Sequence, residues 1–114
     1  MQTSQIRELD AAGFEAMVLG SPGPFLVEFS ADWCPPCRMM EPVLAELAER
    51  LGDRLTIGRL DVDRDPEVTI PYGVLSMPTL ILFAGGRPAA RMVGFTSAGN
   101  VRRWVEQALA AAGG

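Results

Sequence analysis

Two cysteines separated by two residues form the segment Trp-Cys-Pro-Pro-Cys at residues 33–37, and the chain contains no other cysteine. An apolar run at residues 25–30 precedes the pair, and a strong helical pattern follows it. This arrangement constrains the local fold to a strand that leads into a helix. Two thiols at this spacing and in this place are typical of a dithiol that opens and closes a disulfide.

The composition predicts an ordinary globular domain. The chain has 114 residues, of which 48% are hydrophobic and 21% are charged, enough for one core and a single domain over residues 1–114. The formal net charge of −4 argues against nucleic acid or an anionic membrane as a partner. No apolar run approaches the length of a membrane span, and we find no signal-peptide pattern. We therefore expect a cytoplasmic protein, and a monomer.

The missing residue types exclude several chemistries. The chain has no histidine, which excludes a Ser-His-Asp or Cys-His nucleophile and a mixed cysteine–histidine zinc site. All ten basic residues are arginines, so a lysine Schiff base is also excluded. We expect no bound cofactor and no metal, with the Cys34–Cys37 disulfide as the redox centre.

Hydrophobic patterns alternate between strands and helices along the chain. Strands are predicted at residues 5–8, 25–30, 55–62, 79–83 and 87–93. Helix starts are predicted at Asp10, after Cys34, at Asp65 and at Ser97. Pro88 predicts that the last strand lies at a sheet edge. The order of elements predicts an α/β fold, with a central mixed five-stranded sheet flanked by four helices.

The chain resembles the thioredoxins from about Gln5 to Leu109. The motifs that carry the resemblance are Ala-Asp-Trp-Cys-x-x-Cys-Arg, Asp-x-Asp around Val62, Tyr-Gly-Val, Met-Pro-Thr and Val-Gly-Phe, in that order. The resemblance implies the thioredoxin fold and a reductase of protein disulfides. It also implies recycling by an NADPH-dependent thioredoxin reductase, and a role in electron transport and cell redox homeostasis.

The two cysteines are predicted to have different roles. Cys34 lies where a helix begins, and the free N–H groups and dipole there favour a negative charge. We therefore expect Cys34 to attack a substrate disulfide, and the more shielded Cys37 to resolve the mixed disulfide. The family's commonest dipeptide between the cysteines is Gly-Pro, and here it is Pro35-Pro36. Pro35 removes one N–H, and the pair stiffens the loop, which leaves the redox potential open.

Glu28 is the one charged residue in the predicted central strand. The family usually has a buried aspartate here, so the resemblance implies that Glu28 accepts the proton of Cys37. A surface-facing glutamate is the alternative. Arg59 stands where the family usually has lysine. An arginine stays charged and can bind a carboxylate bidentately, and we expect Arg59 to pair with Glu28 and limit the rise in its pKa. A solvated arginine is the alternative there.

The resemblance also implies a cis peptide bond before Pro78, which would place the Met77 backbone beside Cys34, ready to pair with a substrate strand. Substrate-binding residues are then expected in a ring around Cys34, namely Trp33, Pro36, Met77, Pro78, Gly94 and Phe95. Leu75 and Phe95 are large and apolar, which predicts a wider hydrophobic patch for unfolded or extended protein substrates.

Other interpretations of the cysteine pair stay open at this point. A disulfide oxidase or isomerase on the same fold is one, favoured by the Pro-Pro dipeptide. A redox-inert, thioredoxin-like binding module is another. A structural disulfide removes little unfolded-state entropy from so short a loop, and a zinc site shared between two chains requires ligands from both.

Overall fold

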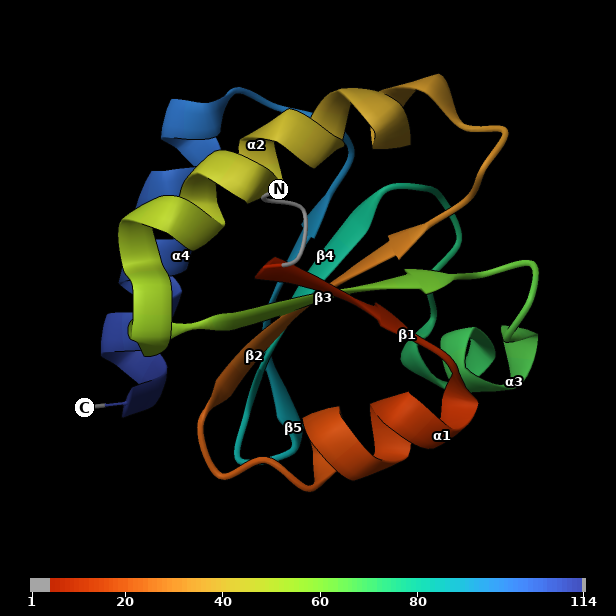
Figure 1. The fold of residues 1–114 in the computed structure, drawn as a ribbon, viewed down its shortest axis with the longest axis horizontal. Coiled ribbons are helices and arrows are strands. Elements are labelled where there is room, and N and C mark those ends of the chain that lie inside the picture. Colours follow the sequence, from red (N-terminus) through yellow and green to blue (C-terminus); the bar gives the residue numbers. More distant parts are fainter. Residues whose placement is uncertain (1–4, 114) are drawn as a thin grey trace.

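The computed structural model describes residues 5–113, which form one five-stranded mixed sheet (Figure 1). The strand order is β1-β3-β2-β4-β5. Strands β1, β3 and β2 are parallel to one another, β4 is antiparallel to β2, and β5 is antiparallel to β4. The strands are β1 (Ile6–Leu9), β2 (Pro24–Ser30), β3 (Thr56–Asp61), β4 (Thr79–Ala84) and β5 (Arg87–Val93). The predicted α/β fold and its mixed five-stranded sheet are therefore confirmed.

Four α-helices flank the sheet, two on each face (Figure 1). Helices α2 (Pro35–Leu51) and α4 (Ala98–Gly113) cover one face. Helices α1 (Ala11–Gly13) and α3 (Pro66–Thr69) cover the other face. Helix α1 continues as a π-helical segment over Phe14–Leu19, and α3 continues as a 3₁₀ turn over Ile70–Tyr72.

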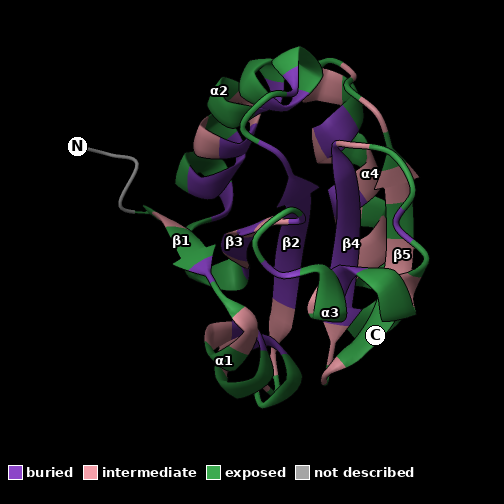
Figure 2. Ribbon diagram, turned by 90° about the vertical axis from the view of Figure 1, so that its right-hand side faces the viewer, coloured by how far each residue is buried: buried purple, intermediate pink, exposed green. Residues whose placement is uncertain are grey.

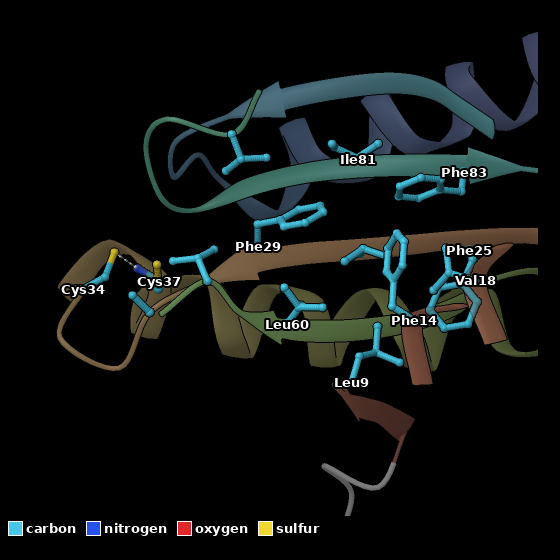
Figure 3. Packing of buried hydrophobic residues seen from close by; sticks show 14 residues of the cluster. Leu9, Phe14, Val18, Phe25, Phe29, Cys34, Cys37, Leu60, Ile81 and Phe83 are labelled. Carbon is cyan, nitrogen blue, oxygen red and sulfur yellow. Dashed lines mark hydrogen bonds between the residues drawn. The ribbon is translucent and has the colours of Figure 1, made fainter. Parts of the chain in front are cut away.

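Strand β2 lies at the centre of the sheet and is buried on both faces (Figure 2). Its odd-numbered residues Phe25, Val27 and Phe29 pack into the cluster on the α1 side (Figure 3). Leu26 points to the opposite side and packs beneath α2 and α4. Because side chains alternate along a strand, Glu28 also points toward the α2 side of the sheet.

The predicted helix starts are confirmed, although one of the expected caps is not formed. Asp10 caps α1 by accepting a hydrogen bond from the backbone N–H of Gly13 at 2.7 Å, and Ser97 accepts one from the N–H of Asn100 at 3.2 Å. Asp65 precedes α3 as expected, but its carboxylate binds Arg64 at 2.9 Å instead of capping the helix. The caps at Asp10 and Ser97 satisfy backbone N–H groups at the starts of α1 and α4 and thereby determine where these helices begin.

Candidate active site

The dithiol lies at the N-terminus of α2. Cys34 is the residue before the first helical position and has an extended backbone, and Pro35 begins the helix. The backbone N–H of Cys37 donates a hydrogen bond to Sγ of Cys34 at 3.3 Å. Both cysteines are free thiols and are almost fully buried, 3% exposed at Cys34 and 1% at Cys37. They lie at one end of the hydrophobic cluster on the α1 side (Figure 3).

The two prolines determine which backbone donors reach Cys34. Neither Pro35 nor Pro36 carries an N–H, so the N–H of Cys37 is the first backbone donor of α2. The N–H of Arg38 donates instead to the carbonyl oxygen of Cys34, at 3.2 Å. The N–H of Cys37 is therefore the backbone donor of α2 that stabilises a negative charge on the Cys34 sulfur.

The Cys37 thiol is held in its protonated form by its surroundings. Burial raises the pKa of Cys37 to about 11, with the hydrogen bond to the Cys34 side chain adding to the rise. Contacts with Ser30 and with the backbone of Ala31 oppose the rise. At neutral pH a thiol with this pKa needs a base before it becomes a nucleophile.

Glu28 is fully buried, which excludes the surface-facing alternative. Burial raises the pKa of the Glu28 carboxyl to about 7, while the positive charge of Arg59 lowers it and the carboxylates of Glu41 and Glu8 raise it. A carboxyl with a pKa near 7 exchanges protons readily at neutral pH. Its two oxygens have no hydrogen-bond partner among residues 5–113.

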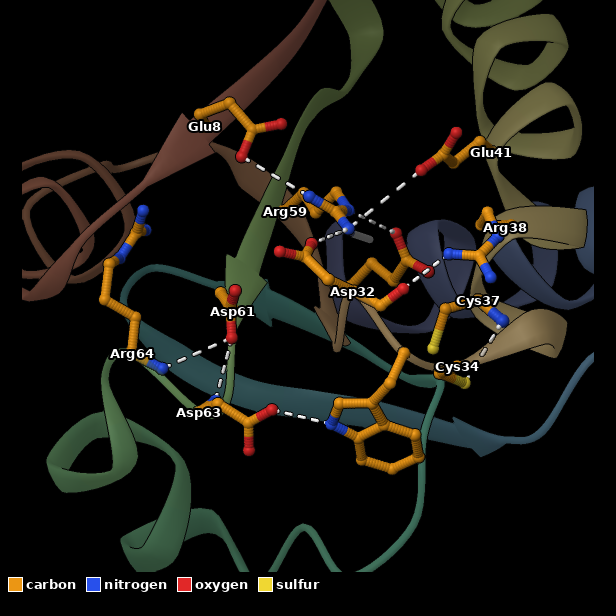
Figure 4. A network of polar contacts seen from close by, with 12 residues as sticks. Glu8, Asp32, Cys34, Cys37, Arg38, Glu41, Arg59, Asp61, Asp63 and Arg64 are labelled. Atoms are coloured by element: carbon orange, nitrogen blue, oxygen red, sulfur yellow. Dashed lines mark hydrogen bonds and ion pairs between the residues drawn. The ribbon is translucent and has the colours of Figure 1, made fainter.

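Arg59 is the positive charge nearest to Glu28, and its side chain is 17% exposed. Its Nε atom lies 3.9 Å from Oε1 of Glu28, so the two side chains form an ion pair but not the bidentate hydrogen bonds that an arginine can make with a carboxylate. The terminal nitrogens instead face the carboxylates of Glu8 at 3.6 Å, Asp32 at 3.5 Å and Glu41 at 4.0 Å (Figure 4). The alternative of a solvated arginine is excluded, but Arg59 divides its charge among four acids.

The Met77–Pro78 peptide bond is cis, as expected. The thiol of Cys34 lies 3.5 Å from the carbonyl oxygen of Met77, so the Met77 backbone is beside the dithiol. The carbonyl oxygen of Pro78 accepts a hydrogen bond from the N–H of Gly94 at 2.7 Å. Gly94 has a φ of +90°, which favours glycine. The structure thus brings together three of the predicted substrate-binding positions with Cys34.

Large apolar side chains are exposed on the segments that surround Cys34. Trp33 is 62% exposed, Leu75 93% and Phe95 39%, and Pro36 is exposed as well. The indole N–H of Trp33 donates a hydrogen bond to Oδ2 of Asp63 at 2.6 Å (Figure 4). Exposed apolar area of this kind is typical of a protein-binding surface.

A comparison with known families decides the assignment, since the thioredoxin family profile matches residues 5–107. The chain belongs to the thioredoxin family. It is 49% identical over 87 residues to thioredoxin from Alicyclobacillus acidocaldarius, which covers 76% of this chain and 82% of that protein. It is 38% identical over 104 residues to thioredoxin from Rhodospirillum rubrum, which covers 91% of this chain and all of that protein.

A third relative joins two activities in one polypeptide. It is the bifunctional thioredoxin reductase/thioredoxin of Mycobacterium leprae, 49% identical over 87 residues. The match covers 76% of this chain but 19% of that longer protein. As a thioredoxin, the present chain is a thiol–disulfide oxidoreductase that reduces protein disulfides, and its redox centre is the cysteine pair.

Several residues of this thioredoxin site were not anticipated as such. Asp63 belongs to the Asp-x-Asp motif noted in the sequence, but its hydrogen bond to Trp33 joins segments 30 residues apart. Asp32 belongs to the Ala-Asp-Trp-Cys motif and Glu8 and Glu41 to no motif, but none of the three was expected beside Arg59. Their convergence follows from the tertiary arrangement alone.

Among residues 5–113, no group of three or more cysteine, aspartate or glutamate side chains is placed so that it could hold a metal ion. Within the same range, no helix has the length and apolar character needed to cross a membrane.

Proposed function

We propose that Cys34 is the nucleophile and Cys37 the resolving cysteine in the reduction of protein disulfides. The observation that carries this proposal is the placement of the Cys34 sulfur at the start of α2, where it accepts the N–H of Cys37 and contacts the Met77 carbonyl. The Cys34 thiolate attacks one sulfur of a substrate disulfide, forms a mixed disulfide and displaces the other substrate sulfur as a thiolate.

Resolution of the mixed disulfide needs a deprotonated Cys37. We assign the proton to Glu28, the buried acid that the family resemblance implies for this role: Cys37, with a pKa of about 11, needs a base, and a carboxyl with a pKa of about 7 takes up and releases protons near neutral pH. The Cys37 thiolate then attacks Sγ of Cys34, and the bond between Cys34 and the substrate breaks. The bonding electrons leave with the substrate sulfur, and the two cysteines are oxidised to a disulfide. Arg59 has a supporting role, since its charge favours the ionised form of Glu28.

Substrates are proposed to dock on the apolar ring around Cys34. An extended chain pairs with the backbone of Met77 next to Pro78. Trp33, Pro36, Gly94 and Phe95 contact its side chains.

The oxidised dithiol is returned to the thiol form by an NADPH-dependent thioredoxin reductase. The Mycobacterium leprae relative, named as a fusion of reductase and thioredoxin, supports this class of partner. We further propose a monomer that acts in the cytoplasm, in electron transport and redox homeostasis.

The reduction potential of the Cys34–Cys37 pair tests the direction of the reaction. The potential is measured by equilibration with a dithiol buffer. A separate assay follows the reduction of a disulfide-bonded protein, with Cys34→Ser as the inactive control. A value near about −270 mV is expected for a reductase. A value well above about −200 mV would contradict it and favour a disulfide oxidase or isomerase. Full function of a Cys34→Ser, Cys37→Ser double variant would favour a redox-inert binding module.

A further inference from the structure

A pocket of about 160 Å³ lies between β1, β3 and α2, and Glu28 belongs to its lining. Glu8, Glu41, Ala45 and Arg59 contribute further walls. The volume is enough for several water molecules, and the charged lining supplies the polar partners that water needs. The pocket therefore lies between the fully buried Glu28 side chain and the half-exposed Glu8 and Glu41 at the surface.

The charges around this pocket are predominantly negative. Arg59 projects from β3, Glu8 from β1 and Glu41 from α2, and Asp32 lies on the loop before the dithiol (Figure 4). Glu8, Asp32 and Glu41 are all at least half exposed, while Glu28 is buried. The guanidinium of Arg59 thus interacts with four carboxylates. How strongly the charges at this site stabilise the ionised form of Glu28 therefore depends also on the other three carboxylates.

We propose that Glu41 is a positioning residue of the exchange reaction, and that Glu28 returns its proton to solvent through the pocket beside Glu41. Glu41 draws part of the charge of Arg59 away from Glu28 and adds a negative charge that faces it. Both effects favour the protonated form of Glu28. The inference rests on the proposed role of Glu28 as the proton acceptor of Cys37.

The proton follows one path in each cycle. It leaves the Cys37 thiol as the thiolate forms, and it is held on the Glu28 carboxyl while Cys37 attacks Sγ of Cys34. Glu28 then releases it to water in the pocket, and a carboxylate at the pocket mouth passes it to bulk solvent. Glu28 ends the cycle as a carboxylate, with no net change in its own charge.

The first test replaces Glu41 by glutamine and follows the titration of Glu28 by carboxyl ¹³C NMR, with the signal assigned through Glu28→Gln. Removal of the Glu41 charge is expected to lower the pKa of Glu28 by roughly half a pH unit, as for one partly screened charge several ångströms away. The pH profile of disulfide reduction moves down by the same amount. Glu41→Asp is expected to restore most of the original value.

Glu46→Gln is the matched control. It removes the same charge from the same helix, at a side chain of similar exposure, 49% against 52%, that binds Arg50 instead of Arg59. We expect it to leave the Glu28 titration unchanged. Equal shifts in Glu41→Gln and Glu46→Gln would overturn the proposal, since they would reflect net charge alone.

A second variant tests the route itself. Ala45→Leu fills the pocket with apolar atoms, which is expected to raise the pKa of Glu28 by further desolvation, opposite in direction to Glu41→Gln. An unchanged or lower pKa in Ala45→Leu would overturn the route. The proposed function fails separately, if Glu28→Gln leaves the pH profile of reduction unchanged.

Discussion

Nε of Arg59 lies 3.9 Å from Oε1 of Glu28, too far for a hydrogen bond but close enough for a strong Coulomb attraction. The carboxyl gains charge stabilisation from Arg59 without a direct donor, so burial dominates and the pKa of Glu28 rises from 4.5 to about 7. A buried ion pair that stabilises the fold needs close, hydrogen-bonded geometry to offset the cost of desolvating its charges. The loose contact instead leaves Glu28 able to take and release a proton near neutral pH.

Replacement of Arg59 by alanine is expected to raise the pKa of Glu28 above about 7, because the positive charge that lowers this pKa is lost. The alkaline shift in the pH profile of disulfide reduction is expected to be roughly one pH unit. Stopped-flow reduction of a protein disulfide between pH 5 and pH 9 measures it. Arg54→Ala, which removes an exposed arginine paired with Glu106, is the control, and an identical profile in both variants would contradict the role of Arg59.

Glu28 is expected to make the protein less stable as the pH rises. Its pKa is higher in the folded state, so the folded protein holds the proton more tightly than the unfolded chain between pH 4.5 and about 7. The stabilisation is therefore complete below pH 4.5 and lost as the pH passes about 7, a difference of roughly 3 kcal/mol.

Glu28→Gln removes this dependence, because glutamine does not titrate. The free energy of unfolding of the variant, relative to the parent, is expected to increase by roughly 3 kcal/mol from pH 4 to pH 8. Urea unfolding of the reduced protein at several pH values measures the difference, in which the other carboxylates cancel. A difference that stays constant with pH would show that Glu28 titrates normally.

Pro35→Gly is expected to make the dithiol less reducing. Glycine adds a backbone N–H at the first position of α2, which stabilises the thiolate form of Cys34, and it loosens the loop that closes the disulfide. One additional hydrogen bond to a charged sulfur corresponds to a rise in reduction potential of about 30 mV. Pro66→Gly, at the first position of α3, is the matched control and leaves the potential unchanged. A lower potential in Pro35→Gly would contradict this account of the helix end.

Phe95→Ala is expected to slow the reduction of protein disulfides by about fivefold to tenfold, since an apolar docking contact is lost. Reduction of a small aromatic disulfide is expected to proceed at the parental rate. Leu19→Ala provides the control, because Leu19 is 40% exposed, close to the 39% of Phe95, but lies against Gly86 at the far hairpin. An equal loss on both substrates would assign Phe95 to the chemistry or to folding instead of docking.

Local patterns were sufficient for the elements of the fold. The apolar run at residues 25–30 predicted the central strand, and Pro88 correctly predicted an edge strand. The cis bond before Pro78 was expected from the family resemblance alone, since nothing in an isolated Met-Pro pair favours it. The burial of Glu28 followed from its place in an apolar strand.

The contacts between segments that are distant in the chain could not be predicted from the sequence. The residue types predicted an ion pair between Arg59 and Glu28, but no pattern indicated that three other carboxylates lie within 4.0 Å of Arg59. Those distances depend on how α2 and β1 approach β3, which no local pattern determines. The same reason applies to Asp63, whose hydrogen bond to Trp33 joins the segment after β3 to the segment after β2.

The two outer strands of the sheet, β1 and β5, have edges that are poorly suited to pairing with another chain. On β5, Pro88 lacks an N–H for pairing, Arg87 and Arg91 add charge, and the register shifts at Leu82 and Phe83 opposite the proline. Strand β1 on the other side spans four residues. Short, charged or irregular edges resist edge-to-edge pairing. We therefore expect both edges of the sheet to resist pairing with exposed strands of other chains.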